Sequence, residues 1–212
     1  MIVMMVGTSS KFSQESKIGA DDENRVSNDG RLISEAASDP EAFARLYRRH
    51  YDAVFRYCVH RLFERQTAED VTSAVFLKVV ENLHRFRGTE RQFRNWLYKI
   101  ATNAVNDHLR KTARRADLLK VAVEYANNQV ADCESATEKP DEKMAILRKA
   151  MLDLRPRYQT IITLRFFENL KLTEIAEVLG SSDGTIRSQL ARALAKLRNK
   201  MGTFQKEVLE DD

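Results

Sequence analysis

The sequence predicts an all-α protein built of two small helical domains that are joined by a flexible linker. Only 7 Gly and 3 Pro occur among 212 residues, and Leu, Ala, Arg and Glu are abundant, a composition that favours helices. Apolar residues recur at helical spacing through most of the chain. One polar stretch, residues 116–140, interrupts this periodicity and ends near a proline, as linkers do. The chain is long enough for each domain to bury a core.

Charge divides the chain into the same blocks. Residues 41–115 carry a net charge of +8 and residues 141–203 carry +5, whereas residues 1–40, 116–140 and 204–212 each carry −3. Two basic helical modules separated by an acidic linker indicate a polyanion that is contacted at two places. The alternative is a pair of solvated domains whose charges only keep them in solution.

The ends of the chain and its sulfur and imidazole side chains indicate no special chemistry. Residues 1–38 are polar and aperiodic, so we expect a mobile extension that becomes helical near Leu32–Ala37 and serves as a regulatory arm or, more commonly, as an untethered terminus. The apolar start MIVMMV is too short for a signal peptide or a membrane span. Cys58 and Cys133 form no CxxC pattern, and the histidines are scattered. We therefore expect a cytoplasmic protein with reduced thiols, no metal, no cofactor and no membrane insertion.

The first module, residues 39–115, reads as three helices. Asp39 as the cap and Pro40 in the first helical position signal a helix start, and a long amphipathic helix follows. The second helix runs from about Thr67, a candidate cap, to Leu83. After the loop HRFRGTERQ, the third helix covers residues 93–111 and contains Trp96. A lone tryptophan at helical spacing is more often a core residue than a base-stacking platform, and both interpretations remain open.

The second module, residues 141–203, ends in a helix-turn-helix. A helix up to Leu154 and another over residues 157–168, with Pro156 at the junction, precede it. Residues 172–197 then form two helices around Gly180, which ends the first, while Ser182 or Asp183 caps the second. Residues 204–212 form an acidic, frayed tail. The expected core of the two preceding helices is Ile146, Met151, Leu154, Ile161, Ile162, Leu164 and Phe166.

The second helix of the helix-turn-helix presents polar and basic side chains that can reach base edges or phosphates from the major groove. The alternative without a DNA-binding role is an ordinary helical hairpin with a solvated basic face. The candidate duplex-binding residues are Thr185, Arg187, Ser188, Gln189 and Arg192.

Four segments, in order, resemble the extracytoplasmic-function (ECF) group of sigma factors of bacterial RNA polymerase. The resemblance covers residues 39–203, and four segments around a variable linker are more specific than a helix-turn-helix alone. Departures include Ser73 and Ala74 in the second segment, and Gln189 and Ala191 in the last. The segments are FARLYRRHYDAVFRYC, AEDVTSAVFLKVVENL, FRGTERQFRNWLYKIATNAVNDHLRK and LRPRYQTIITLRFFENLKLTEIAEVLGSSDGTIRSQLARALAKLR.

The resemblance implies a protein that binds core RNA polymerase and directs initiation at specific promoters. The first module would dock on the polymerase through Glu69, Asp70 and Phe76, and it would hold the melted −10 strand. The second module would read duplex −35 DNA with the five residues of the helix-turn-helix. The residues that the resemblance and the basic track assign to the −10 strand are Arg87, Arg91, Gln92, Asn95, Lys99 and Asn103.

The expected partners are therefore core RNA polymerase and promoter DNA, and no small-molecule substrate. Because the polymerase performs the chemistry, no catalytic residue is needed, and no cluster of carboxylates or phosphate-cradling Gly loop is present in the sequence. We hypothesise that the free protein is held inactive by an anti-sigma factor or by packing of its own two modules. The alternatives are a stand-alone helix-turn-helix regulator and a nucleic-acid enzyme or helical adaptor.

Overall fold

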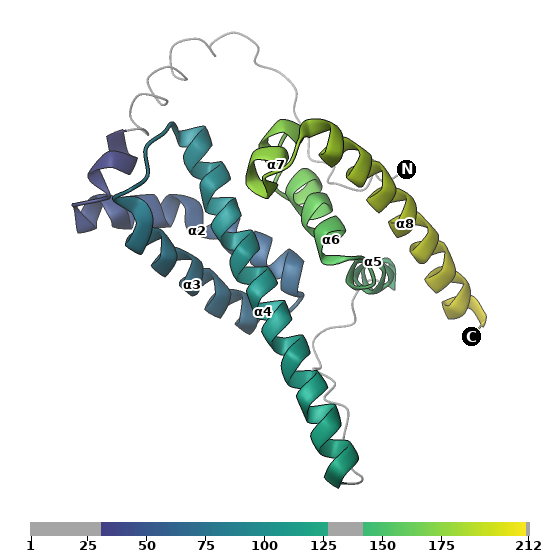
Figure 1. Cartoon of the computed structure of the whole chain (residues 1–212). Coiled ribbons are helices and arrows are strands. Elements are labelled where there is room, and N and C mark those ends of the chain that lie inside the picture. Colours follow the sequence, from purple (N-terminus) through teal and green to yellow (C-terminus); the bar gives the residue numbers. More distant parts are fainter. Residues whose placement is uncertain (1–30, 127–141, 211–212) are drawn as a thin grey trace.

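The computed structural model describes residues 31–126 and 142–210, and within these ranges every regular element is a helix (Figure 1). The all-α prediction is therefore confirmed. Three long helices form the first module, and shorter helices followed by one long helix form the second. The elements are α2 (Pro40–Leu62), α3 (Arg65–Leu83), α4 (Glu90–Ala126), α5 (Glu142–Leu152), α6 (Pro156–Ile162), the π-helical turn η2 (Thr163–Phe167), α7 (Leu172–Leu179) and α8 (Asp183–Glu210).

The start of α2 follows the local signals in the sequence. Asp39 is extended, and its carboxylate accepts the backbone N–H of Glu41 at 2.9 Å, while Pro40 takes the first helical position. The prediction of a cap at Asp39 is confirmed. The preceding residues 31–35 are also helical, and Ile33 and Ala36 are buried against the bundle. The core of the first module thus reaches N-terminal of residue 39, and residues 1–30 lie outside the described part of the chain.

The start of α3 and the length of α4 differ from the predictions. The cap of α3 is Glu64, whose carboxylate accepts the N–H groups of Gln66 at 2.7 Å and Thr67 at 2.5 Å, so the predicted cap at Thr67 is wrong. A carboxylate three residues earlier reaches the free N–H groups better than the hydroxyl. Helix α4 continues through Ala126, well into the predicted linker, because residues 112–126 contain no Gly or Pro that would end it. The remainder of that linker lies outside the described residues.

A π-helical turn changes the second module. Pro156 begins α6 as predicted, but the regular helix ends at Ile162 and continues as η2. The wider turn points Thr163 and Leu164 inward and leaves Phe166 44% exposed. The prediction that Phe166 belongs to the core is therefore wrong.

The helix-turn-helix has the predicted local geometry. Gly180 ends α7 with a left-handed backbone, φ 60°. The hydroxyl of Ser182 accepts the N–H of Thr185 at 3.2 Å, so Ser182 is the cap of α8 and Asp183 is its first residue. Helix α8 continues beyond Leu197, where the sequence pattern placed its end, as far as Glu210.

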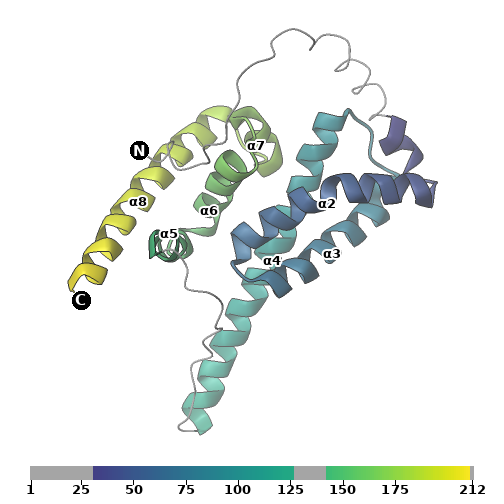
Figure 2. The same ribbon diagram turned by 180° about the vertical axis from the view of Figure 1, so that it is seen from behind.

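The two modules pack against each other. In both views α4 lies between the α2–α3 pair and the second module, with α7 against its N-terminal half (Figures 1 and 2). Ile161, Leu164 and Ile175 of the second module belong to the same buried cluster as Val54 and Leu97 of the first. A smaller cluster, which includes Met151 and Leu197, holds α5, α6 and α8 together. The linker that the sequence predicts therefore joins two modules that are in contact in this structure.

A buried arginine joins the modules at the far end of α2. The Arg61 side chain is almost fully enclosed, and its guanidinium donates to the side chain of Gln159 in α6 and to Asn106 Oδ1 in α4 at 3.3 Å. The amide of Gln159 also donates to the carbonyls of Leu152 at 3.2 Å and Leu154 at 2.9 Å. Gln159 therefore accepts a hydrogen bond from a buried charged group and also donates to backbone carbonyls at the end of α5 and in the loop before α6.

Replacing Gln159 by Ala removes these hydrogen bonds and leaves the Arg61 guanidinium short of a partner in the interior. We expect the free energy of unfolding to fall by about 1–3 kcal/mol, the usual penalty for an unsatisfied buried polar group. Urea unfolding followed by circular dichroism measures this, with the exposed Gln66→Ala as the matched control. A loss no larger than that of the control contradicts the assigned role of Gln159.

Candidate nucleic-acid interface

Three of the five predicted residues of α8 lie together on one exposed strip of the helix. Thr185, Ser188 and Arg192 are three or four positions apart, so they share one solvent-facing strip of the helix. Ile186 and Ala193 lie on the opposite side and are buried. The structure therefore presents three of the five predicted residues together.

The other two predicted residues of α8 lie at the edges of this strip and have side-chain partners. Arg187 pairs with Asp183, one turn earlier, at 2.9 Å. Gln189 Oε1 accepts the Nε–H of Arg157 in α6 at 2.8 Å, and the same guanidinium also bonds the hydroxyl of Ser181 in the turn. Sequence reasoning missed Arg157, because no local signal shows that the start of α6 lies beside α8.

The loop before α4 is ordered by its own hydrogen bonds. Thr89 N–H donates to Gln92 Oε1 at 2.8 Å, and Gln92 N–H donates to Thr89 Oγ1 at 3.3 Å, a reciprocal cap at the start of α4. Arg87 donates to the carbonyls of His84 at 2.9 Å and Phe86 at 2.7 Å. These bonds use part of the hydrogen-bonding capacity that Gln92 and Arg87 would offer to DNA.

The five predicted −10 residues that lie on α4 divide between two faces of the helix. Gln92, Lys99 and Asn103 are exposed along one strip. Trp96 lies in this strip but is partly buried, with its ring centroid 5.2 Å from that of Phe86. The core interpretation of Trp96 agrees with this packing.

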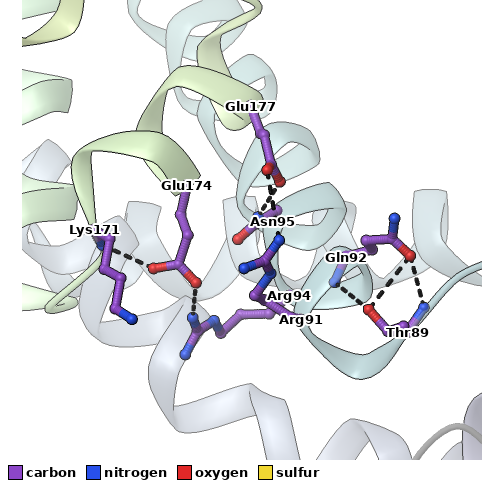
Figure 3. A network of polar contacts seen from close by, with 8 residues as sticks. All are labelled: Thr89, Arg91, Gln92, Arg94, Asn95, Lys171, Glu174 and Glu177. Atoms are coloured by element: carbon purple, nitrogen blue, oxygen red, sulfur yellow. Dashed lines mark hydrogen bonds and ion pairs between the residues drawn. The ribbon is translucent and has the colours of Figure 1, made fainter. Parts of the chain in front are cut away.

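Arg91 and Asn95 face the second module instead (Figure 3). Asn95 is 4% exposed, and its Nδ2 donates to Glu177 Oε2 of α7 at 2.6 Å. Arg91 Nη2 lies 3.8 Å from Glu177 Oε1. A single carboxylate of α7 therefore occupies two side chains that the sequence assigned to the −10 strand.

A second carboxylate of α7 extends the same contact. Glu174 accepts the N–H of Lys171 at 2.8 Å, which caps the start of α7, and its other oxygen binds the Arg94 guanidinium of α4 (Figure 3). Glu174 is buried, so this ion pair is shielded from water on the carboxylate side. The residue that closes the helix cap thus also ties the two modules together.

A third carboxylate meets α4 one turn further along. The hydroxyl of Tyr98 donates to Glu168 Oε2 at 2.7 Å. Burial raises the pKa of Glu168 above its usual value, while the hydrogen bond from Tyr98 and the charge of Arg56 oppose the shift. Burial and the neighbouring Glu168 also raise the pKa of Tyr98, so the phenol is the donor in this pair.

The exposed face of α3 carries the candidate polymerase contact. Asp70 is exposed, and Glu69 is partly exposed and pairs with Arg65 at 3.1 Å. Leu77 (62% exposed) and Val80 (51% exposed) continue the face that Asp70 begins. Two large apolar side chains exposed on one helix favour a contact with a partner at this face, and sequence reasoning had not singled them out as site residues.

Phe76 does not belong to that exposed face. It is 5% exposed and packs on Tyr47 of α2, with ring centroids 4.6 Å apart. The structure therefore places Phe76 behind the face, in the core of the bundle, where it can support α3 but offers little surface of its own to a partner.

Within the described ranges, no helix is both long and apolar enough to cross a membrane. The His, Cys, Asp and Glu side chains that the structure describes form no group that could hold a metal ion. Cys58 is buried, and burial raises the pKa of its thiol to about 11, so the thiol is protonated near neutral pH.

Comparison with known proteins identifies the family. The model of Sigma-70 region 2 matches residues 46–115, and that of Sigma-70, region 4, matches residues 144–197. The chain is 32% identical to the RNA polymerase sigma-H factor of Pseudomonas aeruginosa, over 73% of this chain and 83% of that protein. It is 31% identical to the ECF RNA polymerase sigma-E factor of Haemophilus influenzae, over 77% and 89%. The chain belongs to the ECF group of the sigma-70 family.

Other relatives agree with this assignment. The ECF RNA polymerase sigma factor BldN of Streptomyces coelicolor is 32% identical over 76% of this sigma factor, which spans 61% of the length of BldN. Both regions occur in the order expected from the four sequence segments. This sigma factor is therefore not a stand-alone helix-turn-helix regulator.

Solved structures share the fold at lower identity. CnrH in complex with the cytosolic domain of CnrY is similar with a TM-score of 0.59 and 23% identity, over 82% of this chain and 97% of that chain. The sigma factor RpoE in complex with the anti-sigma factor NepR, from Bartonella quintana, gives 0.57 and 19%, over 76% and 96%. These likenesses concern the fold alone.

The raised pKa of Glu168 predicts a pH-dependent contact. A raised pKa means that the folded protein favours the protonated carboxyl, so this stabilisation is present below the ordinary value of 4.5 and is lost as pH rises through the raised value. Glu168→Gln keeps an acceptor for Tyr98 and stays neutral. We expect its stability relative to the wild type to increase as pH rises above 4.5 and through the raised pKa of Glu168.

Urea unfolding at several pH values measures this difference, with the exposed Glu81→Gln as the control. A difference between Glu168→Gln and the wild type that does not change with pH contradicts the raised pKa of Glu168.

Proposed function

We propose that this sigma factor binds core RNA polymerase and directs initiation at promoters whose −35 element it reads as duplex and whose −10 element it holds as a single strand. The observation that carries the proposal is the exposed strip of Thr185, Ser188 and Arg192 on the second helix of a helix-turn-helix. It accompanies a separate basic module that a stand-alone reader of duplex DNA does not need. The proposed setting is the cytoplasm, and the polymerase supplies all the catalytic groups.

At the −35 element, α8 would lie in the major groove. Arg192 and Arg187 carry donors suited to guanine or phosphate, and Arg187 would first leave Asp183. Ser188 and Gln189 offer shorter polar contacts. Thr185, in the first turn of α8, suits a phosphate because free N–H groups gather at a helix start.

At the −10 element, the exposed strip of Gln92, Lys99 and Asn103 would follow the single strand. Arg87, in the loop before α4, would extend this contact. Arg91 and Asn95 would join them only after Glu177 leaves. We propose that the described packing of the modules is a resting form and that binding of polymerase and promoter opens it.

The polymerase would meet the exposed face of α3. Asp70 and Glu69 supply charge there, Leu77 and Val80 supply apolar area, and Phe76 supports the helix from behind. The structure of CnrH contains the cytosolic domain of CnrY, and that of RpoE contains the anti-sigma factor NepR. By this likeness we also propose an anti-sigma partner for this chain.

Replacing Arg187 and Arg192 by Ala should reduce −35-dependent initiation while leaving polymerase binding intact, because the two arginines lie in the second module and away from α3. Each lost base contact lowers binding by about 1–3 kcal/mol, so initiation should fall by at least tenfold. In vitro transcription with core polymerase measures initiation, and native gel shift of core measures binding. Arg198→Ala, further along α8, is the matched control.

The reciprocal variant, Asp70→Arg, should weaken core binding and leave duplex binding unchanged. Equal loss of both activities in either variant contradicts the proposed division of labour between α3 and α8.

Replacing Glu177 by Ala should strengthen binding of a single-stranded −10 oligonucleotide to the free protein. The change frees the Asn95 amide and the Arg91 guanidinium, and losing one hydrogen bond to a charged group corresponds to roughly a tenfold gain in affinity. Fluorescence anisotropy of a labelled strand measures this, with Glu41→Ala as a charge-matched control on α2. An affinity equal to that of the wild type contradicts the proposal that Glu177 competes with DNA.

A further inference from the structure

We infer that Arg157 sets the base preference of the recognition helix by fixing Gln189 as a hydrogen-bond donor. The inference rests on the −35 role of α8 proposed above. Arg157 lies at the start of α6, outside the helix-turn-helix, and would act through Gln189 as a positioning residue.

The guanidinium of Arg157 is held between two parts of the helix-turn-helix. Its Nε donates to Gln189 Oε1 at 2.8 Å, and its Nη2 donates to the hydroxyl of Ser181. The backbone of Ser181 is itself fixed, because its N–H donates to the carbonyl of Ala176 at 2.9 Å across the end of α7. Arg157 therefore approaches Gln189 from a defined direction, at the edge of the strip that faces DNA.

This contact determines which way the glutamine amide points. A guanidinium has only donors, so the Gln189 oxygen must face Arg157 and its NH2 group must point away. Charge assistance from the arginine strengthens the bond relative to one between neutral groups. Gln189 thus offers two hydrogens to a base and keeps its oxygen beside a positive charge.

The orientation favours guanine over adenine. A glutamine reads adenine by accepting from N6 and donating to N7 at the same time, which needs both ends of the amide. With the oxygen turned to Arg157, only the donating end is free, and guanine presents two acceptors, N7 and O6, in the major groove. The second lone pair of the oxygen lies next to the guanidinium, where the positive edge of an adenine amino group is repelled.

The exposed position of the Arg157 side chain allows the inference to be tested by substitution. Its side chain is exposed and lies in no core cluster of the described residues, so its removal should leave the fold intact. Arg155, two residues earlier, is also exposed, and its hydrogen bonds to Tyr158 and Gln159 use the backbone carbonyl alone. Arg155→Ala therefore removes an equal charge from the same helix start without touching Gln189.

The experiment is transcription by core polymerase with this sigma factor from templates randomised across the −35 element, followed by sequencing of the transcripts. We expect Arg157→Ala to raise the adenine-to-guanine ratio at one −35 position by roughly fivefold or more, the effect of one bidentate contact. Arg157→Met, which keeps the aliphatic stem, should show the same shift, whereas Arg155→Ala should keep the wild-type ratio. In a Gln189→Ala background, Arg157→Ala should add no shift.

Two results overturn the inference while leaving the proposed function in place. One is a uniform fall in initiation across all sequences, which a plain phosphate contact of Arg157 would give. The other is an unchanged base ratio in Arg157→Ala and Arg157→Met. If the wild type itself initiates at no sequence in the library, the proposed sigma function fails, and the inference fails with it.

Discussion

Three carboxylates of the second module that meet one face of α4 hold this structure in its described arrangement. Each binds a donor on α4, and one of them also caps α7, so the cap, the ion pair and the position of the helix-turn-helix depend on one another. The hydrophobic cluster shared by the modules stabilises their contact, but burial of apolar surface is not directional and does not fix their orientation. The pairs are Glu168 with Tyr98, Glu174 with Arg94, and Glu177 with Asn95.

Local signals in the sequence predicted the local structure well. Gly180 ends α7 because the left-handed conformation costs a glycine little, and Asp39 caps α2 with its own carboxylate. The predictions fail where another side chain takes the place of the predicted cap, and where packing changes the type of helical turn. Glu64 outcompetes Thr67 as a cap, and the π turn, which propensity does not encode, moves Phe166 to the surface.

The candidate site was predictable only where it lies on a single helix. The α8 residues follow from the helical period, although the period alone does not show that Arg157 reaches Gln189 from α6. On α4, the same period groups Gln92 with Lys99, and packing of the second module then separates them from Asn95. Long-range contacts between modules decide which polar side chains are free, and no pattern within one helix carries that information.

The central claim is that this chain gives core RNA polymerase its promoter specificity. The most direct measurement is transcription by purified bacterial core polymerase from a promoter library, with and without this protein. We expect protein-dependent initiation from templates that share one −35 and −10 pair. Specific binding of duplex DNA by the protein alone, with no binding to core and no protein-dependent transcript from any template, would contradict it.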